Sequence, residues 1–209
     1  MTDIYTAHHQ IALQRSALYQ HLAEMLTYPS ESLLQSCRTG DRDNKISELL
    51  SDFPYELSWP GDTCAADEAV SKLPSEYMRV FELPIDGQPC ALYGGVHTGN
   101  RREVMEELLR YYRLFGLSVD KALNEDLPDS IPTLLEFFQF LTHKESGATD
   151  ADEVASVRLV QKDILERHLT KWIPAIQSQL NQRKPPAFYR SSIDLLNEFT
   201  VGELGQLAG

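Results

Sequence analysis

The amino-acid sequence predicts an all-α protein, and three observations support this prediction. Apolar residues recur at helical spacing in several segments, and no stretch of four or more residues alternates convincingly between apolar and polar side chains. The composition, with 42% hydrophobic and 24% charged residues, is typical of a soluble globular protein. A length of 209 residues allows a sizeable core without disulfides or metals, so we expect residues 1–209 to form a single helical-bundle domain.

The first third of the chain is predicted to contain three helices. The first runs from about residue 9 to residue 27, with an apolar stripe on one side and Arg15, Gln20 and Glu24 on other faces, and it ends at Tyr28-Pro29. Short helices are expected near residues 30–34 and 44–50. The segment 52–63 contains two prolines and a glycine, so it is predicted to be a connection, with Trp59 packed on the core.

A helix from about residue 65 to residue 81 should follow, either continuous or broken near Pro74. The next segment, residues 83–98, contains prolines and glycines that disfavour a regular helix, but it is too apolar for a free linker. A loop of this kind is more often packed and functional than idle. Asn100 and Glu103 fit a capping pair for the next helix, which carries one apolar stripe and ends at Gly116.

The most informative segment is an acidic loop followed by a strongly apolar helix, residues 125–141. Asp129 or Ser130 is expected to cap the helix, and Pro132 fits its first turn, so the helix should begin near Ile131. Its side chains are apolar on almost every face, which indicates a helix covered on several sides. Glu136 is the exception, because a carboxylate in such a helix needs a partner or solvent.

The last third of the chain is also predicted to be helical. Thr149 and Asp152 fit a helix start, and one apolar face then continues to Trp172 and ends at Pro174. A short helix through Leu180 and a final amphipathic helix over residues 189–199 complete the expected bundle.

Charge and cysteine content limit the classes of partner and compartment. The formal net charge is −12, with 31 acidic and 19 basic side chains, which argues against nucleic acid and favours a cationic partner. The three cysteines are widely spaced and contain no CxxC pair, so we expect free thiols in a reducing compartment. No apolar run approaches the roughly 18 residues that cross a bilayer, and residues 1–10 lack a signal-peptide pattern. A cytoplasmic protein without stable membrane insertion is therefore expected.

Motifs for catalysis or metal binding are scarce. None of the six histidines belongs to an HExxH motif or to a Glu-x-x-His pair, and His168 is interpreted as a core histidine. The chain contains no GxSxG motif and no P-loop, and Gly94-Gly95 is interpreted as a turn requirement. Cys90 is interpreted as a packed thiol. We therefore expect no catalytic residue, no metal ligand and no cofactor.

The clearest functional signal is a charge pattern. Residues 120–153 contain nine acidic side chains and only two lysines. Such a run is often a solvated face. Here it adjoins the most apolar helix and an aromatic loop, and a peptide carrying arginines followed by an apolar stretch would complement both features.

Several stretches resemble the TorD/DmsD/NarJ family of redox-enzyme maturation chaperones, cytoplasmic proteins that attend molybdenum oxidoreductases before cofactor insertion and export. Together they span most of the chain in the order found in the family. The resemblance is carried by residues 18–29, residues 76–81 leading to Pro89 and Tyr93, residues 112–117, residues 127–137 and residues 161–174. The family usually has a histidine after the aspartate of its proline-aspartate motif, whereas this chain has Ser130, a departure that leans toward the nitrate-reductase-like or dehydrogenase-associated branches.

The resemblance implies an all-helical TorD-like chaperone that binds a client and does no bond chemistry. Its client would be the N-terminal leader, such as a twin-arginine signal peptide, or the catalytic subunit of a molybdopterin-containing enzyme of anaerobic respiration. The protein would be a monomer or a helix-swapped dimer. The residues expected to bind the client are Tyr77, Phe81, Pro89, Tyr93, Asp126, Pro128, Asp129, Ser130 and Glu136.

The sequence leaves two other classes open. A structural adaptor or subunit of a redox complex would keep its partner permanently, and a small helical metal-binding enzyme would need inward-facing metal ligands. For the chaperone, an acidic rim would orient the client and an apolar groove would supply most of the affinity. The double substitution of Asp126 and Asp129 by asparagine is then expected to weaken binding while the fold survives.

Overall fold

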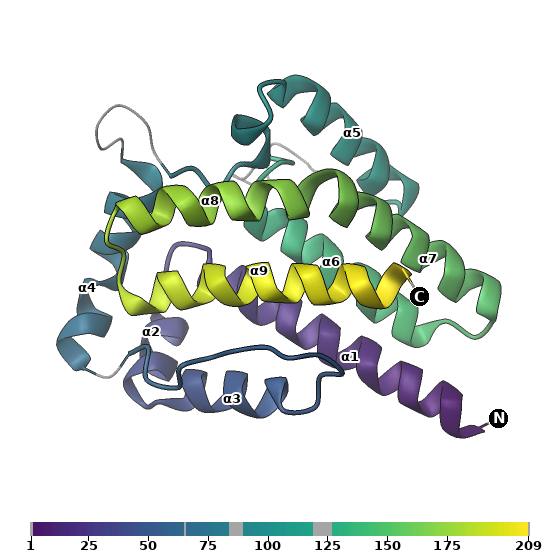
Figure 1. The fold of residues 1–209 in the computed structure, drawn as a ribbon, viewed down its shortest axis with the longest axis horizontal. Helices are drawn as coiled ribbons and strands as arrows, with labels where there is room; N and C mark the ends of the chain where they lie inside the picture. The colour runs from purple at the N-terminus through teal and green to yellow at the C-terminus, as the bar shows by residue number, and fades with distance from the viewer. Residues whose placement is uncertain (1, 65, 84–89, 119–126, 209) are drawn as a thin grey trace.

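The computed structural model describes residues 2–64, 66–83, 90–118 and 127–208, with side chains from residue 9 onward. Within these ranges the chain forms helices joined by short connections, and its isolated β-bridge belongs to no strand (Figure 1). The prediction of an all-α protein is confirmed.

Two helix pairs form the centre of the bundle. Helix α1 (Thr2–Met25) lies along α6 (Ile131–Gly147), and α8 (Thr170–Gln182) lies beside α9 (Ala187–Ala208) (Figure 1). As predicted, α6 begins at Ile131, Pro132 lies in its first turn, and its apolar side chains enter the core. The predicted side-chain cap is wrong: the Ser130 side chain makes no capping hydrogen bond, and Asp129 bonds elsewhere.

Short helices cover the lower end of the bundle in Figure 1, namely α2 (Glu31–Arg38) and α3 (Asp41–Leu50), followed by α4 (Asp67–Tyr77). The connection between α3 and α4 contains no helix in its described residues, as predicted. Trp59 in this connection packs against the core, and its indole Nε1 donates to Asp43 at 2.8 Å.

Pro74 and Pro174 do not end helices, in contrast to the end predicted at Pro174. Pro74 lies inside α4, and Pro174 lies inside α8. Each proline lies near a π-helical segment, η1 (Met78–Glu82) after α4 and η3 (Leu165–Leu169) before α8. Because a wide turn shifts the register of the backbone hydrogen bonds, the helix continues from α7 (Ala151–Ile164) through η3 into α8. Helix α7 is capped by Asp150, whose carboxylate accepts from the Glu153 amide at 2.8 Å, and not by Thr149.

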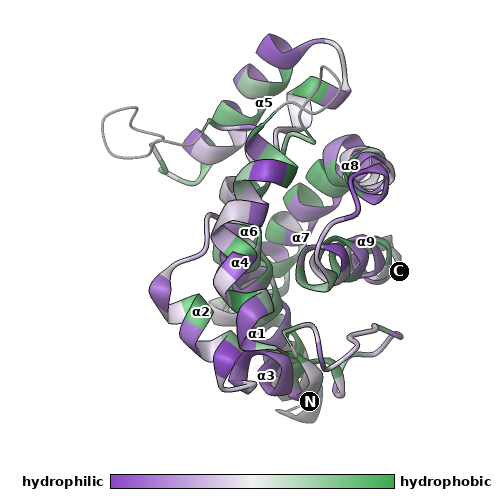
Figure 2. Cartoon of the chain, turned by 90° about the vertical axis from the view of Figure 1, so that its left-hand side faces the viewer, coloured by the Kyte–Doolittle hydropathy of each residue, from purple (hydrophilic) through white to green (hydrophobic). Residues whose placement is uncertain are grey.

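Helix α5 (Arg101–Leu114) stands at the top of the molecule, somewhat apart from the other helices (Figure 2). The Asn100 side chain caps it by accepting from the Glu103 amide, and Gly116 follows it with a φ of 72°, as the capping prediction requires. A short 3₁₀ turn, η2 (Gly94–His97), lies below it. Aromatic side chains attach α5 to α6, with the Tyr112 and Phe137 ring centroids 4.7 Å apart.

A buried ionic network joins the two central helix pairs. The Arg15 guanidinium of α1 donates to Glu203 of α9 at 2.7 and 2.8 Å and to Glu145 of α6 at 2.7 Å. Gln161 of α7 bonds both Arg15 and Glu145. Glu203 is fully buried and also accepts from the Tyr55 hydroxyl at 2.9 Å. The network therefore ties four helices and the 51–66 connection together.

Candidate binding surface

The start of α6 is fixed by a cluster built around Asp129. The Asp129 carboxylate accepts from the Gly95 amide at 3.1 Å and from Arg101 Nε at 2.9 Å. The backbone of Tyr93 forms an antiparallel bridge with Ser130, and the Arg101 guanidinium lies 4.9 Å from the Tyr93 ring centroid. Asp129 thus connects η2, the first turn of α5 and the start of α6.

Gly94 and Gly95 are required in this cluster for steric reasons. A Cβ atom on Gly94 would lie 2.0 Å from Cε3 of the buried Trp172 ring. A Cβ atom on Gly95 would lie 2.8 Å from the Arg101 Cα and 2.9 Å from the Asp129 carboxylate. Neither glycine has a positive φ. The prediction that Gly94 and Gly95 are needed for a turn is therefore wrong. They are needed because other atoms pack too closely for a side chain.

Asp129 does not belong to an exposed acidic rim. Its exposed fraction is 0%, and both carboxylate oxygens are used within the chain. Ser130 is also buried, and Pro128 is half-buried with its carbonyl accepting from the Tyr112 hydroxyl at 2.9 Å. Burial raises the pKa of the Tyr112 hydroxyl, with further contributions from Asp129 and Glu136. The expectation that Asp129 meets solvent is wrong, because Arg101 and the Gly95 amide enclose its carboxylate. The sequence gives no sign that Arg101 reaches this position.

The predicted aromatic residues Tyr77 and Phe81 lie mostly inside the protein. Their ring centroids are 5.2 Å apart, and both rings contact Tyr189 of α9. Tyr28, which follows α1, packs edge-on against Tyr77 with the centroids 5.7 Å apart and remains 53% exposed. Pro89 and Asp126 lie outside the described residues.

The run of acidic residues does not form one surface in the part of the chain that the structure describes. Glu145 points into the buried network, Glu153 pairs with Lys144 at 3.0 Å, and Asp150 caps α7. Glu136 is exposed on the outer face of α6. The sequence brings these carboxylates close together along the chain, but helical geometry directs Glu136 and Glu145 to opposite sides of α6.

Glu136 lines a cavity of about 510 Å³ between α6, the end of α1 and the start of α2. We call it the acidic cavity, and it is lined by Gln20, Ala23, Glu24, Thr27, Tyr28, Ser30, Glu136 and Gln139. A hydrogen bond with His21 and the charge of Arg42 lower the pKa of Glu24 to about 2. The Glu24 carboxylate is ionised at neutral pH and pairs with Arg42 at 2.9 Å, and no basic side chain is among the described residues that line the cavity, so its lining is acidic.

Apolar side chains lie one turn beyond Glu136 along α6. Phe140 is one turn further along α6, so it shares the outer face with Glu136, and its ring centroid is 6.0 Å from that of Phe115 at the end of α5. Both rings are half-buried. Three exposed leucines lie near this pair in the sequence or in the segment that precedes α6, namely Leu114, Leu117 and Leu127. We call Leu114, Phe115, Leu117, Leu127 and Phe140 the apolar end.

The sequence alone identified only one residue of this surface, Glu136. Gln20 and Glu24 were expected on other faces of the first helix, but no sequence signal placed them opposite residue 136. Tyr28 was interpreted only as part of a helix stop. One sequence signal could have indicated this surface: Glu136 and Phe140 are four residues apart, so they lie on the same face of the helix.

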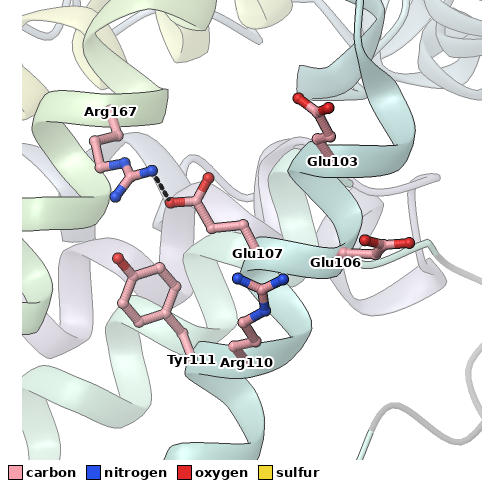
Figure 3. Close-up of a pocket in the computed structure, with 6 residues that line it drawn as sticks. All are labelled: Glu103, Glu106, Glu107, Arg110, Tyr111 and Arg167. Atoms are coloured by element: carbon pink, nitrogen blue, oxygen red, sulfur yellow. Dashed lines mark ion pairs between the residues drawn. The ribbon is translucent and has the colours of Figure 1, made fainter.

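A second cavity, of about 420 Å³, lies between α5 and η3 (Figure 3). The residues that line it are Glu103, Glu106, Glu107, Arg110, Tyr111 and Arg167. Glu107 and Arg167 form an ion pair at 2.6 Å, and Glu106 pairs with Arg102 at 2.9 Å. Since charges of both signs line this cavity and several are paired within the chain, it favours neither cations nor anions.

His168 lies behind this second cavity in the core, as the sequence predicted. It is 3% exposed, its ring packs on Trp172, and its Nε2 lies 3.5 Å from a Glu107 oxygen. Burial lowers the pKa of His168. Among the described residues, no group of three or more histidine, cysteine, aspartate or glutamate side chains is arranged to hold a metal ion. No helix among them is long and apolar enough to span a membrane.

Comparisons with known proteins assign the family. The family described as "Nitrate reductase delta subunit" matches residues 32–177. The chain is 34% identical over 134 residues to the perchlorate reductase assembly chaperone protein of Dechloromonas aromatica (strain RCB), covering 63% of this chain and 59% of that protein. It is 33% identical over 143 residues to the selenate reductase assembly chaperone protein of Thauera selenatis, covering 65% of this chain and 72% of that protein.

A third relative is the chlorate reductase assembly chaperone protein of Ideonella dechloratans, 32% identical over 111 residues that cover 52% of this chain and 57% of that protein. The chain thus spans less than two thirds of the perchlorate and chlorate relatives. The matched family region contains α2 to α7, η3 and the first half of α8, and therefore includes the Asp129 cluster and Glu136. The chain belongs to the nitrate reductase delta subunit family, which agrees with the resemblance of its sequence to NarJ-type chaperones.

Proposed function

We propose that this chain is an assembly chaperone for the catalytic subunit of a molybdenum-containing oxidoreductase. It would bind the N-terminal leader of that subunit in the cytoplasm and hold it until cofactor insertion and assembly are complete. The observation that carries the proposal is the outer face of α6, where Glu136 lines the acidic cavity and Phe140, one turn further along, packs against Phe115. Three relatives are named as reductase assembly chaperones, which supports this class of function.

The proposed recognition has two physical parts. A basic side chain of the leader would enter the acidic cavity, which is lined by the carboxylates of Glu24 and Glu136 and by the ring of Tyr28, groups that can contact a guanidinium or ammonium ion; at Glu24 it would share the carboxylate with Arg42. An apolar stretch of the leader would cover the apolar end, and removing those side chains from water would supply most of the affinity. The function is binding and release, and it needs no bond chemistry.

Of the nine residues predicted to bind the client, Glu136 is the one we propose as a direct contact. Tyr77 packs against Tyr28 and Phe81 packs against Tyr77, and Tyr93, Asp129 and Ser130 fix the start of α6. These residues would therefore act on the client through the position of α6 and Tyr28.

The client can be identified by affinity purification of the tagged chain from its own source, grown anaerobically. Partners would be identified by mass spectrometry before and after a salt wash. We expect a reductase catalytic subunit that still lacks its cofactor. A fully assembled and permanently bound complex would favour the adaptor class, and stoichiometric metal in the purified chain would favour the enzyme class.

The surface can then be tested with a synthetic peptide of the recovered subunit's N-terminus, using fluorescence anisotropy. Glu136→Gln and Leu114→Ser should each weaken binding by about threefold to tenfold, since each removes a partly solvated contact. Glu48→Gln on α3 and Leu159→Ser on α7 are matched controls, because Leu159 is 67% exposed and Leu114 is 68% exposed. Equal affinities for all four variants would refute this surface even if the purification had identified a client.

A further inference from the structure

A basic side chain of the protein itself holds one carboxylate of the acidic cavity. Arg42, the second residue of α3, donates from Nη2 to Oε2 of Glu24 at 2.9 Å. The same guanidinium donates from Nη1 to Nδ1 of His21 at 2.8 Å, and the histidine nitrogen is the acceptor because arginine has no acceptor atom. Arg42 is not among the residues that line the cavity, so it reaches Glu24 from outside the cavity.

The fold holds Arg42 in this position. The carboxylate of the next residue, Asp43, accepts from the Thr63 amide at 3.1 Å and from the Thr63 hydroxyl at 2.7 Å. It also accepts from the Trp59 indole at 2.8 Å. These bonds fix the start of α3, and the side chain of Arg42 is only 9% exposed. The position of this guanidinium beside Glu24 is therefore set by folding, before any client arrives.

The Glu24 carboxylate remains partly open although it has partners inside the chain. Its Oε1 accepts from the Gln20 amide at 3.1 Å, its Oε2 accepts from Arg42, and the side chain is 41% exposed. In the described part of the chain, Glu24 is the carboxylate that pairs with Arg42, and the buried Nε of Arg42 has no hydrogen-bond partner there. A second cation at Glu24 therefore competes with Arg42 for the same carboxylate, and the two positive charges repel each other.

We propose that Arg42 is an internal competitor for Glu24 and limits how tightly the acidic cavity holds the basic side chain of a client. This inference rests on the proposed function and adds a regulation of the same site. The client's cation shares Glu24 with a guanidinium that is already in place, so its stay in the cavity is shortened. A weaker hold favours release, which a chaperone needs once its client is assembled.

The test uses the full chain and two fluorescein-labelled synthetic peptides. In the first peptide one arginine precedes an apolar stretch, and in the second citrulline, which has nearly the same shape but no charge, replaces the arginine. Arg42→Gln should bind the arginine peptide about twofold to fivefold more tightly than the unmodified chain, chiefly because dissociation is slower. The citrulline peptide should bind both chains equally. Fluorescence anisotropy measures the affinities, and stopped-flow fluorescence measures the dissociation rates.

Arg38→Gln is the matched control, because it removes the same charge from the neighbouring helix α2. Arg38 pairs with Glu31 at 3.3 Å and with Asp67 at 3.2 Å, and neither carboxylate lines the acidic cavity. This variant should bind the arginine peptide as the unmodified chain does. If Arg42→Gln binds no more tightly than Arg38→Gln, the inference is refuted, since any gain would then reflect the net charge alone.

A second measurement uses the unmodified chain and does not depend on the folding of Arg42→Gln. In protein labelled with nitrogen-15 arginine, a saturating amount of the arginine peptide should shift the Nε resonance of Arg42, which Arg42→Lys assigns. The citrulline peptide should leave it in place, and an unchanged resonance with both peptides would overturn the inference. If the arginine peptide does not bind the unmodified chain, or binds Glu136→Gln equally well, the proposed surface fails and this inference with it. Binding that depends on Glu136 but not on Arg42 refutes the inference alone.

Discussion

At the scale of single residues, the main difference between sequence and structure concerns contacts that are distant along the chain. Gly94 was interpreted as a turn residue, but its role is to admit the ring of Trp172. Asp129 was expected to face solvent, but Arg101 and the Gly95 amide bury it. A residue type signals a special requirement, whereas the partner that imposes the requirement becomes known only from the fold.

The close packing of Gly94 gives a direct test. Gly94→Ala should lower the free energy of unfolding by about 1–3 kcal/mol or more, because the added methyl group overlaps the Trp172 ring. The matched control is Gly205→Ala in α9, where a Cβ atom meets nothing within 4 Å. There the substitution should stabilise the helix by about 0.5–1 kcal/mol. Urea unfolding of the two variants measures both effects, and an equal stability would show that the core adjusts around residue 94 without cost.

At the scale of elements, the sequence predicted where helices occur better than where they end. The helix start at residue 101 agrees with the predicted Asn100 cap, and the start at residue 131 agrees with the position of Pro132. Pro174 was a misleading signal, because the helix runs from α7 through the π-helical segment η3 into α8, whereas Pro74, where a break had been left open, lies inside α4. Arg15 was expected on a face of the first helix other than its apolar stripe, and it is 4% exposed and binds Glu145 and Glu203. Periodicity assigns a charged residue to a face, but it does not reveal that this face meets another charged helix.

The buried network that joins these elements can be tested through Glu203. Glu203→Gln removes the charge that faces Arg15, and the buried guanidinium then retains Glu145 as its only close carboxylate among the described residues. Breaking a buried pair in this way typically costs about 3–5 kcal/mol. Glu198→Gln, also in α9, is the control and should change the stability by less than about 1 kcal/mol, because this carboxylate is only partly buried. If urea unfolding shows similar losses for both, the network contributes little to stability.

At the scale of the whole molecule, tyrosine burial predicts how stability depends on alkaline pH. Burial raises the pKa values of Tyr19, Tyr55, Tyr112 and Tyr189 above their ordinary value. A group whose pKa is raised by folding contributes stability that is complete below its unfolded pKa, about 10 for tyrosine, and is lost as the pH rises above that value. Each such tyrosine should add about 1.4 kcal/mol per pH unit to the rate at which the free energy of unfolding falls above pH 10. Urea unfolding at successive pH values measures the slope, and Tyr55→Phe should reduce it by one tyrosine's share. A flat profile above pH 10 would mean that these hydroxyls ionise within the folded chain.

The net charge of the whole chain should govern how fast a client arrives more than how long it stays. With a formal charge of −12 the protein attracts a basic leader over a distance comparable with the Debye length, whereas the apolar end acts only on contact. Raising the salt concentration should therefore slow association of the proposed leader peptide by about tenfold or more and change dissociation much less. Stopped-flow fluorescence with the unmodified peptide, and with a peptide whose basic residues are replaced by glutamine, measures both rates. The neutral peptide should associate slowly at every salt concentration. If salt instead accelerates dissociation of the basic peptide and leaves its association unchanged, the charge acts within the acidic cavity alone and the field of the whole molecule has no part in recognition.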